Sequence, residues 1–250
     1  AIDAETSELR LYMREPSEWT ERVVATLPGK VADAILVDYD HEGDLDVCLV
    51  GDFGVRLLRN DGAELVAGGL SDATAEAGLD GVGALAWCLS EDWDTDQDVD
   101  FLFGGADGVV LADNLRGGRF EVRSDLTGDL PSGGVRPVVF DHNNDARPDL
   151  AFGDGRWFHG RADRRFVAEA GGPRGALLGG GLDLDANGSD DAFGRDAAGA
   201  FGLWLNGQVW HALGLEVAPA ALVLWADGDG KGADDLVVVT DGEAWLHAAA

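Results

Sequence analysis

Short apolar runs separated by polar turns make up most of the chain. Val, Leu, Ile, Ala and Phe gather in runs at 34–37, 101–103 and 236–239, for example, with no helical period. Apolar runs of this length between clusters of Gly, Asp and Asn are typical of β-strands. One helical turn is expected at 72–77, with Gly78 as its stop. The pattern therefore predicts an all-β chain.

The predicted strands recur in groups of four. Four antiparallel strands per repeat is the plan of a β-propeller blade, so we expect a single β-propeller domain over residues 1–250, with five blades. The last group lacks a fourth strand, and the strand at 19–27 is expected to supply it and close the ring. The strand at 8–14 is then left over. It is an extra edge strand, or the chain is a slice of a six- or seven-bladed ring. The predicted strands are 8–14 and 19–27; 32–37, 47–51, 55–59 and 63–67; 85–89, 101–103, 109–112 and 119–123; 137–140, 150–152, 156–159 and 165–169; 176–182, 191–193, 200–205 and 208–212; and 221–225, 236–239 and 244–247.

An acidic segment of nine residues joins the first two strands of every group. We call these segments loops 1 to 5 and number their residues as positions 1 to 9; they begin at residues 38, 92, 141, 183 and 227. Recurrence at this interval is the signature of a repeat architecture. Positions 1, 3 and 9 are Asp or Asn in every loop. A loop that gathers carboxylates at alternating positions is typical of a site for a hard cation, most often Ca²⁺, although Asp is also common in solvated turns.

The candidate ligands are the side chains at positions 1, 3, 5 and 9 and the main-chain carbonyl at position 7. We expect four calcium sites, with loop 5 weak or empty, because Lys231 stands at its position 5 and has no lone pair to offer. The candidate residues are Asp38, Asp40, Glu42, Asp44 and Asp46 in loop 1; Asp92, Asp94, Asp96, Asp98 and Asp100 in loop 2; Asp141, Asn143, Asp145, Arg147 and Asp149 in loop 3; Asp183, Asp185, Asn187, Ser189 and Asp191 in loop 4; and Asp227, Asp229 and Asp235 in loop 5.

The spacing is not that of an EF-hand, which needs a bidentate Glu at position 12 and a flanking helix on each side. Position 12 is Leu, Phe, Gly or Val here, and the flanks are strands. The pattern D-x-D-x-D-G-x-x-D-L between two strands instead resembles the FG-GAP or VCBS-type repeat. That resemblance implies a calcium-loaded β-propeller, as in integrin alpha subunits and bacterial surface proteins, that works outside the cytoplasm. The chain departs from the pattern at position 6, where loops 2 and 3 have Gln97 and Ala146.

The charge of the chain limits its partners. The formal net charge is −29, and four or five bound calcium ions would cancel only about 8 to 10 of these charges. Such a surface repels nucleic acid and anionic lipid. No apolar run is long enough for a membrane helix, and no signal-peptide pattern stands at Ala1. Cys48 and Cys88 lie in strand patterns and are expected to be buried free thiols, with a bridge between blades as the alternative.

Other chemistry is sparse in the sequence. The histidines, at positions 41, 142, 159, 211 and 247, share no metal-ligand spacing and are expected to be solvated or packed. Trp157, Trp204 and Trp245 recur in third strands, where they either pack between blades or form a sugar-stacking platform. No nucleophile motif is present, so we expect a non-catalytic module.

The function predicted from the sequence is that of a structural or protein-interaction module, acting as a monomeric domain at the cell surface, in the periplasm or outside the cell. A lectin-like propeller that binds a glycan, or an accessory domain of a polysaccharide-active enzyme, is the alternative. Partner contacts are expected at the surface connections 68–82 and 124–135.

Overall fold

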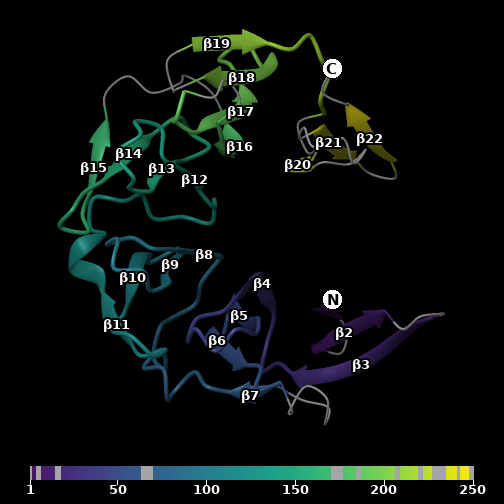
Figure 1. Ribbon diagram of the computed structural model, residues 1–250, viewed down its shortest axis with the longest axis vertical. Helices are drawn as coiled ribbons and strands as arrows, with labels where there is room; N and C mark the ends of the chain where they lie inside the picture. Colours follow the sequence, from purple (N-terminus) through teal and green to yellow (C-terminus); the bar gives the residue numbers. More distant parts are fainter. Residues whose placement is uncertain are drawn as a thin grey trace. The chain divides into compact units, whose positions relative to one another are not determined.

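The computed structural model describes residues 2–3, 7–14, 18–62, 70–169, 177–183, 187–205, 209–218, 222–226, 235–240 and 243–247. This part of the chain is built from antiparallel strands, with one 3-10 turn, η1 (Ser124–Leu126). It divides into two compact units, one of residues 1–136 and 161–166 and the other of residues 137–160 and 167–250. The units are described separately below, and Figure 1 gives the labels of their elements.

Each acidic-loop repeat forms one sheet of its own, which we call blades 1 to 5 (Figure 1). Within the described residues, blades 1 to 4 have four strands and blade 5 has three. The strands are β4 (Val31–Val37), β5 (Asp46–Gly51), β6 (Gly54–Arg59) and β7 (Ser71–Asp72); β8 (Trp87–Glu91), β9 (Asp100–Gly105), β10 (Gly108–Asn114) and β11 (Phe120–Arg123); β12 (Val138–Phe140), β13 (Asp149–Ala151), β14 (Trp157–Gly160) and β15 (Phe166–Glu169); β16 (Leu177–Leu182), β17 (Asp191–Arg195), β18 (Phe201–Leu205) and β19 (Val209–Ala212); and β20 (Leu222–Ala226), β21 (Asp235–Thr240) and β22 (Glu243–His247).

The all-β prediction is confirmed, and five repeats fit five blades. Blade 1 differs in one respect. Its fourth strand is β7, whereas the predicted strand at 63–67 lies outside the described residues. An additional sheet precedes blade 1, made of β1 (Ile2–Asp3), β2 (Glu8–Arg14) and β3 (Trp19–Thr26) in that order. In it β3 pairs with β2 along its whole length, so pairing of 19–27 with the last blade stays a prediction.

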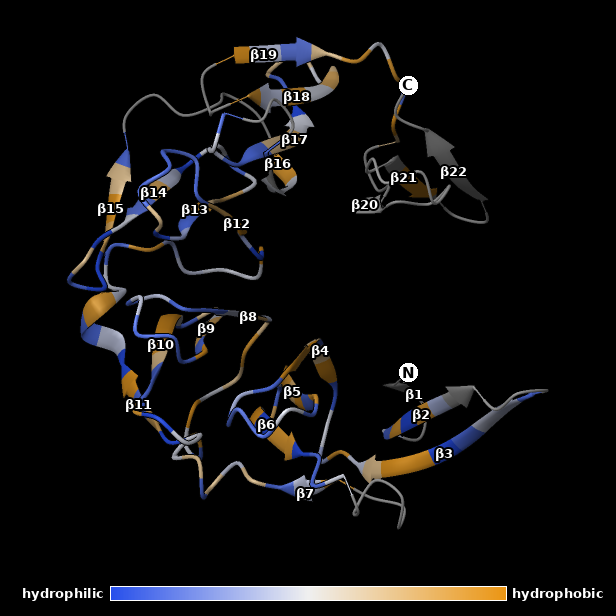
Figure 2. Cartoon of the chain, in the orientation of Figure 1, coloured by the Kyte–Doolittle hydropathy of each residue, from blue (hydrophilic) through white to orange (hydrophobic). Residues whose placement is uncertain are grey.

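The main core of the first unit lies between blades 1 and 2. Cys48 and Leu57 of blade 1 and Cys88, Phe101 and Phe103 of blade 2 belong to one cluster of fully buried side chains. Figure 2 shows β5 and β6 largely in the hydrophobic colour, with hydrophilic segments between the strands. Both cysteines are free and buried, as the sequence predicted. A hydrogen bond with Cys88, together with burial, raises the pKa of the Cys48 thiol well above its ordinary value.

The two connections expected to carry partner contacts also take part in this unit's packing. In the connection 68–82, Ala73, Ala77 and Leu79 are buried in the same cluster. Ala77 N–H donates to the Ala73 carbonyl at 2.8 Å and Gly78 follows with φ +80°, which is the expected single helical turn. In the connection 124–135, Leu126 and Leu130 are buried. Replacing these segments with Gly-Ser turns would therefore open the core, and their assignment as recognition loops stays a prediction that rests on their exposed residues.

Glycines in the strands make room for aromatic side chains on the neighbouring strand. Gly104 faces Trp87 across the β8–β9 ladder, and a Cβ at Gly104 would lie 2.0 Å from the indole ring. Trp87 cannot move away easily, because its Nε1 donates to the Gly133 carbonyl at 3.2 Å and its side chain is fully buried. Gly179 has the same relation to Phe193 in blade 4, where a Cβ would lie 2.2 Å from the ring. Close packing therefore explains these glycines.

We expect Gly104→Ala to lower the free energy of unfolding by about 1–3 kcal/mol, because the added methyl group overpacks a rigid site. Urea denaturation monitored by tryptophan fluorescence measures the change. Gly128→Ala is the matched control, because a Cβ there meets nothing within 4 Å; its stability should stay the same or rise slightly. Equal stability of the two variants would contradict the packing argument.

Candidate cation-binding loops

The carboxylate at position 1 organises the main chain of each described loop. In loop 2, Asp92 accepts hydrogen bonds from the N–H groups of positions 5 and 6, both at 3.0 Å. Asp141 in loop 3 and Asp183 in loop 4 accept the same pair at 2.8–3.1 Å. In loop 1, Asp38 accepts from position 6 at 3.0 Å. The loops therefore share one conformation that the sequence repeat encodes.

Position 6 has a left-handed backbone in all four of these loops. Its φ is +90° at Gly43, +75° at Gln97, +60° at Ala146 and +94° at Gly188. Glycine adopts this conformation freely, whereas a residue with a Cβ is strained by roughly 1–2 kcal/mol. Gln97 and Ala146, the two departures from the sequence pattern, therefore keep the loop conformation at an energetic cost.

Position 9 is the most buried part of each loop. The exposed fractions of Asp46, Asp100, Asp149 and Asp191 are only 0–2%. The Asp100 carboxylate accepts hydrogen bonds from the N–H of Trp93, at position 2, and from the N–H of Asn114, at the end of the third strand, at 3.1 and 2.7 Å. Asp46 and Asp149 make the same two kinds of bond. This carboxylate therefore joins the loop to the end of the third strand.

Burial disfavours the charged form of these carboxylates. It raises the pKa of Asp46 to about 6 and the pKa of Asp100 to about 7, although hydrogen bonds from main-chain N–H groups lower both. The pKa of Asp94 is also raised, first by burial and then by the neighbouring Asp96. A cation bound among these groups would offset that cost.

Loops 1 and 2 bring their carboxylates together. Oxygens of Asp38, Asp40 and Asp46 in loop 1 lie within 4.8 Å of one another, and so do those of Asp92, Asp94 and Asp96 in loop 2. Three carboxylate oxygens in these loops are buried without a hydrogen-bond partner: Oδ1 of Asp38, Asp44 and Asp94. A buried acceptor of this kind is costly unless something binds it. The donor set consists of oxygens only, and it fits a hard divalent cation.

The other predicted ligands that the structure describes are less buried or have protein partners of their own. Glu42 and Asn143 are exposed, as are Asp145, Asp183 and Asn187. Asp98 at position 7 is nearly buried, and it pairs with Arg116 at 3.2 Å and His41 at 3.4 Å. Arg147 donates its main-chain N–H to Asp145 at 3.1 Å, whereas the N–H of Ser189 is donated to Asn187 at 2.9 Å. Asp185, Asp227, Asp229 and Lys231 lie outside the described residues, as does the side chain of Asp235, so nothing bears on the prediction for loop 5.

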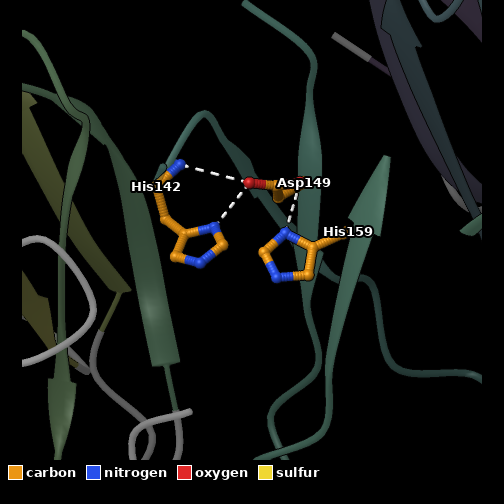
Figure 3. Close-up of side chains that lie close together, drawn as sticks. All are labelled: His142, Asp149 and His159. Atoms are coloured by element: carbon orange, nitrogen blue, oxygen red, sulfur yellow. Dashed lines mark hydrogen bonds and ion pairs between the residues drawn. The ribbon is translucent and has the colours of Figure 1, made fainter. Parts of the chain in front are cut away.

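Loop 3 differs from loops 1 and 2 in what surrounds its position 9. The centroids of the imidazole rings of His142, at position 2, and His159, on β14, are 4.6 Å apart, and both rings lie beside the Asp149 carboxylate (Figure 3). Their Nδ1 atoms are 2.5 and 3.5 Å from the Asp149 carboxylate. Burial lowers the pKa of His142, but the carboxylates of Asp149, Glu169 and Asp141 outweigh it, and the pKa is raised. The structure thus brings His142, Asp149 and His159 together in a group that could hold a metal ion, a proximity that their spacing in the sequence did not indicate.

The residues that correspond to the two histidines in blades 1 and 2 can be identified from the hydrogen bonds of position 9. Position 2 is Tyr39 in loop 1 and Trp93 in loop 2, and its N–H bonds to the position 9 carboxylate in both. The residue before the strand-end donor is Arg59 in blade 1, Asp113 in blade 2 and His159 in blade 3. The distance along the chain from position 9 to that donor is 14 residues in blades 1 and 2 but 11 in blade 3. Neither the spacing of the histidines nor an alignment on position 9 alone therefore indicates the cluster.

Of the three tryptophans in third strands, one is buried, one is half-buried and one has a side chain that is not described. Trp157 is buried, its ring meets Phe140 edge-on at 5.0 Å, and it belongs to one cluster with Leu177 and Ala192 of blade 4, so it packs between blades. Trp204 is half-buried and forms a tilted pair with Trp210 at 5.0 Å across β18 and β19. The side chain of Trp245 lies outside the described part.

No protein-family model matches the chain, and neither does any curated protein. Solved structures do. A lectin from Agrocybe aegerita, specific for non-reducing terminal N-acetylglucosamine, matches with a TM-score of 0.60 and 16% identity. BBS1N, in complex with ARL6DN, matches with a TM-score of 0.55 and 13% identity. In each case 96% of this chain and 71% of the other are covered. The likeness shows the fold, a β-propeller. None of the helices in the described part is long and apolar enough to cross a membrane.

We expect Asp100→Ala to destabilise the protein by about 2 kcal/mol or more even in chelator, because two buried N–H groups lose their acceptor. Denaturant unfolding in excess EDTA is the measurement. The exposed Asp107, on the β9–β10 turn, supplies the control variant Asp107→Ala, which should change little. If Asp100→Ala loses stability only when calcium is present, position 9 serves the cation and not the fold.

Proposed function

We propose that the protein is a calcium-stabilised β-propeller of the FG-GAP or VCBS type that acts as a protein-interaction module outside the cytoplasm. The observation that carries the proposal is the set of buried, unpartnered carboxylate oxygens in loops 1 and 2. Two of the residues concerned, Asp38 and Asp94, each lie beside two further carboxylates. Acceptors in such a position call for a cation, and an all-oxygen donor set favours Ca²⁺.

The proposed role of the ion is to stabilise the blades. The loops connect the first and second strands of their blades, and position 9 ties each of the first three to the end of its third strand. An ion that binds only the folded loop shifts the folding equilibrium by about 2.7 kcal/mol per site at a hundredfold excess over the dissociation constant. Sites of modest affinity fill where calcium is millimolar, which supports a location outside the cytoplasm.

The binding role is supported by the fold and by the charge of the chain. One structure of this fold is in complex with a second protein, ARL6DN. With 47 acidic and 18 basic residues, the surface favours a partner with a basic contact area. No catalysis is proposed, since the acidic groups of the loops serve the main chain and the ion.

A glycan-binding role is the second candidate, and the Trp204–Trp210 pair favours it. Both rings are half-buried, and Trp204 Nε1 is buried without a partner. Aromatic faces with a polar edge are suited to stacking on sugars. A lectin with the same fold supports this alternative.

Calcium should raise the melting temperature by several degrees relative to excess chelator, because it binds the native loops alone. Differential scanning calorimetry at equal ionic strength, with Mg²⁺ as the comparison ion, measures the difference. Asp40→Asn and Asp94→Asn keep the shape of position 3 but remove a charge, so each should reduce the calcium-dependent gain.

Two controls make this result specific. Asp107→Asn removes an exposed charge outside the loops and should leave the gain unchanged. The melting temperatures of all variants in chelator should be close to that of the parent. Identical melting with calcium and with chelator would sink the calcium proposal.

A glycan array probed with calcium-loaded protein distinguishes the protein-interaction role from the glycan-binding role. We expect no specific signal for a protein-interaction module. Binding to terminal N-acetylglucosamine or another glycan that is lost in Trp204→Ala, with folding unchanged, would establish the second candidate in its place.

A further inference from the structure

The two histidines of blade 3 share a second carboxylate on the side away from Asp149. Nε2 of His142 and Nε2 of His159 lie 3.2 and 2.9 Å from the same oxygen, Oε2 of Glu169 at the end of β15. His142 and Asp149 are largely buried, whereas about a third of the Glu169 side chain is exposed. Each ring is thus held between a buried carboxylate and a carboxylate that reaches solvent (Figure 3 shows the Asp149 side).

This arrangement prepares both rings as metal ligands. A carboxylate that accepts Nδ1–H fixes the tautomer in which the lone pair is on Nε2, and metal-binding histidines commonly have such a partner. The amide nitrogen Nδ2 of Asn143 lies 3.1 Å from Nδ1 of His159. Turning this amide by 180° would place its oxygen there, where it can accept the Nδ1–H bond. With both Nδ1 atoms protonated, two Nε2 lone pairs and a carboxylate oxygen face one point. These acceptors repel one another unless a cation stands between them.

We propose that His142 Nε2, His159 Nε2 and the Glu169 carboxylate bind a divalent transition metal of the zinc class, with Asp149 as a positioning residue. Ligand atoms at about 2.0–2.1 Å from a tetrahedral zinc ion stand roughly 3.3 Å apart. The Nε2–Oε2 distances of 3.2 and 2.9 Å are already close to that value. Imidazole nitrogen suits zinc, whereas calcium prefers oxygen, so this site differs in kind from loops 1 and 2.

Among blades 1 to 3, the described residues form this site in blade 3 alone. The matching positions are Tyr39 with Arg59 in blade 1, and Trp93 with Asp113 in blade 2. Neither pair supplies an imidazole. Three protein ligands leave one position of a tetrahedral ion for water or for a ligand group, and the exposed edge at Glu169 lets it approach.

The test is a calorimetric Zn²⁺ titration of the full chain, first stripped with chelator and then saturated with Ca²⁺ so that the acidic loops are filled. We expect one Zn²⁺ per chain at micromolar affinity or better. His159→Ala should weaken binding at least a hundredfold, and Glu169→Gln about tenfold to a hundredfold. His211→Ala, which removes an exposed histidine of β19, is the matched control and should bind as the parent does.

Co²⁺ reports on the coordination of the site in the parent protein itself, through its visible absorption. Added to the parent protein, it should produce the intense visible absorption of a four- or five-coordinate ion with nitrogen ligands, and Zn²⁺ should displace it. In Asp149→Asn the band should shift while the stoichiometry holds, since the ligands stay and only their orientation and basicity change.

Three results would overturn the proposal. The first is a parent protein that binds no Zn²⁺ and gives no Co²⁺ band. In that case, a rise of both imidazole pKa values in an NMR titration would mean that protons alone neutralise the cluster. The second is a Zn²⁺ affinity that His159→Ala does not change. The third is an affinity lost in Asp149→Asn but kept in Glu169→Gln, which would place the ion on the Nδ1 side.

Discussion

The buried carboxylate at position 9 is the constraint on which the repeats depend. In each of the first three blades it accepts one N–H from the start of the loop and one from the end of the third strand. Removing a carboxylate from water is costly, and main-chain N–H bonds recover only part of that cost, as the raised pKa values of Asp46 and Asp100 indicate. Once position 9 is fixed, the carboxylates at positions 1 and 3 have little freedom to separate. The fold therefore creates a demand for positive charge at a defined place in the loops of these three blades.

The repeats meet that demand differently, through residues outside the acidic pattern. Loop 2 has Arg164 beside Asp94 at 3.5 Å, and Arg116 beside Asp98. Loop 3 has two imidazoles against Asp149. The same loop therefore offers a cation only carboxylate oxygens in blades 1 and 2, whereas in blade 3 it also offers imidazole nitrogens. The change requires only two side chains, at position 2 and at the end of the third strand.

Most of the fold could be predicted from the sequence, because strand periodicity and the acidic loops are local signals. β2 spans the predicted residues 8–14, and most other strands differ from prediction by one or two residues. The sequence was least informative about burial and about contacts between strands, because tertiary packing determines both. Leu79 stands between Gly78 and Asp80 in the sequence, yet it is buried because the connection folds back onto the blade core. The His142–His159 pair depends on the register of β13 and β14, and residues far apart in sequence meet only once that register is set.

Contacts between neighbouring loops limit how their charges can relax. In the first unit, Asn114 at the end of β10 donates to the Tyr39 carbonyl in loop 1 at 3.0 Å, and His41 faces Asp98. In the second unit, Asp141 of loop 3 and Asp190 of loop 4 exchange hydrogen bonds at 2.9 and 3.0 Å. Loops held together by main-chain bonds cannot reduce their repulsion by moving apart. The repulsion has to be neutralised in place, by arginine, by protonation or by bound cations. With 47 acidic and 18 basic residues, the chain has too few side-chain cations to neutralise all of its carboxylates. The charge balance of the whole chain and the geometry of single loops therefore both support the proposal that bound cations neutralise the loops.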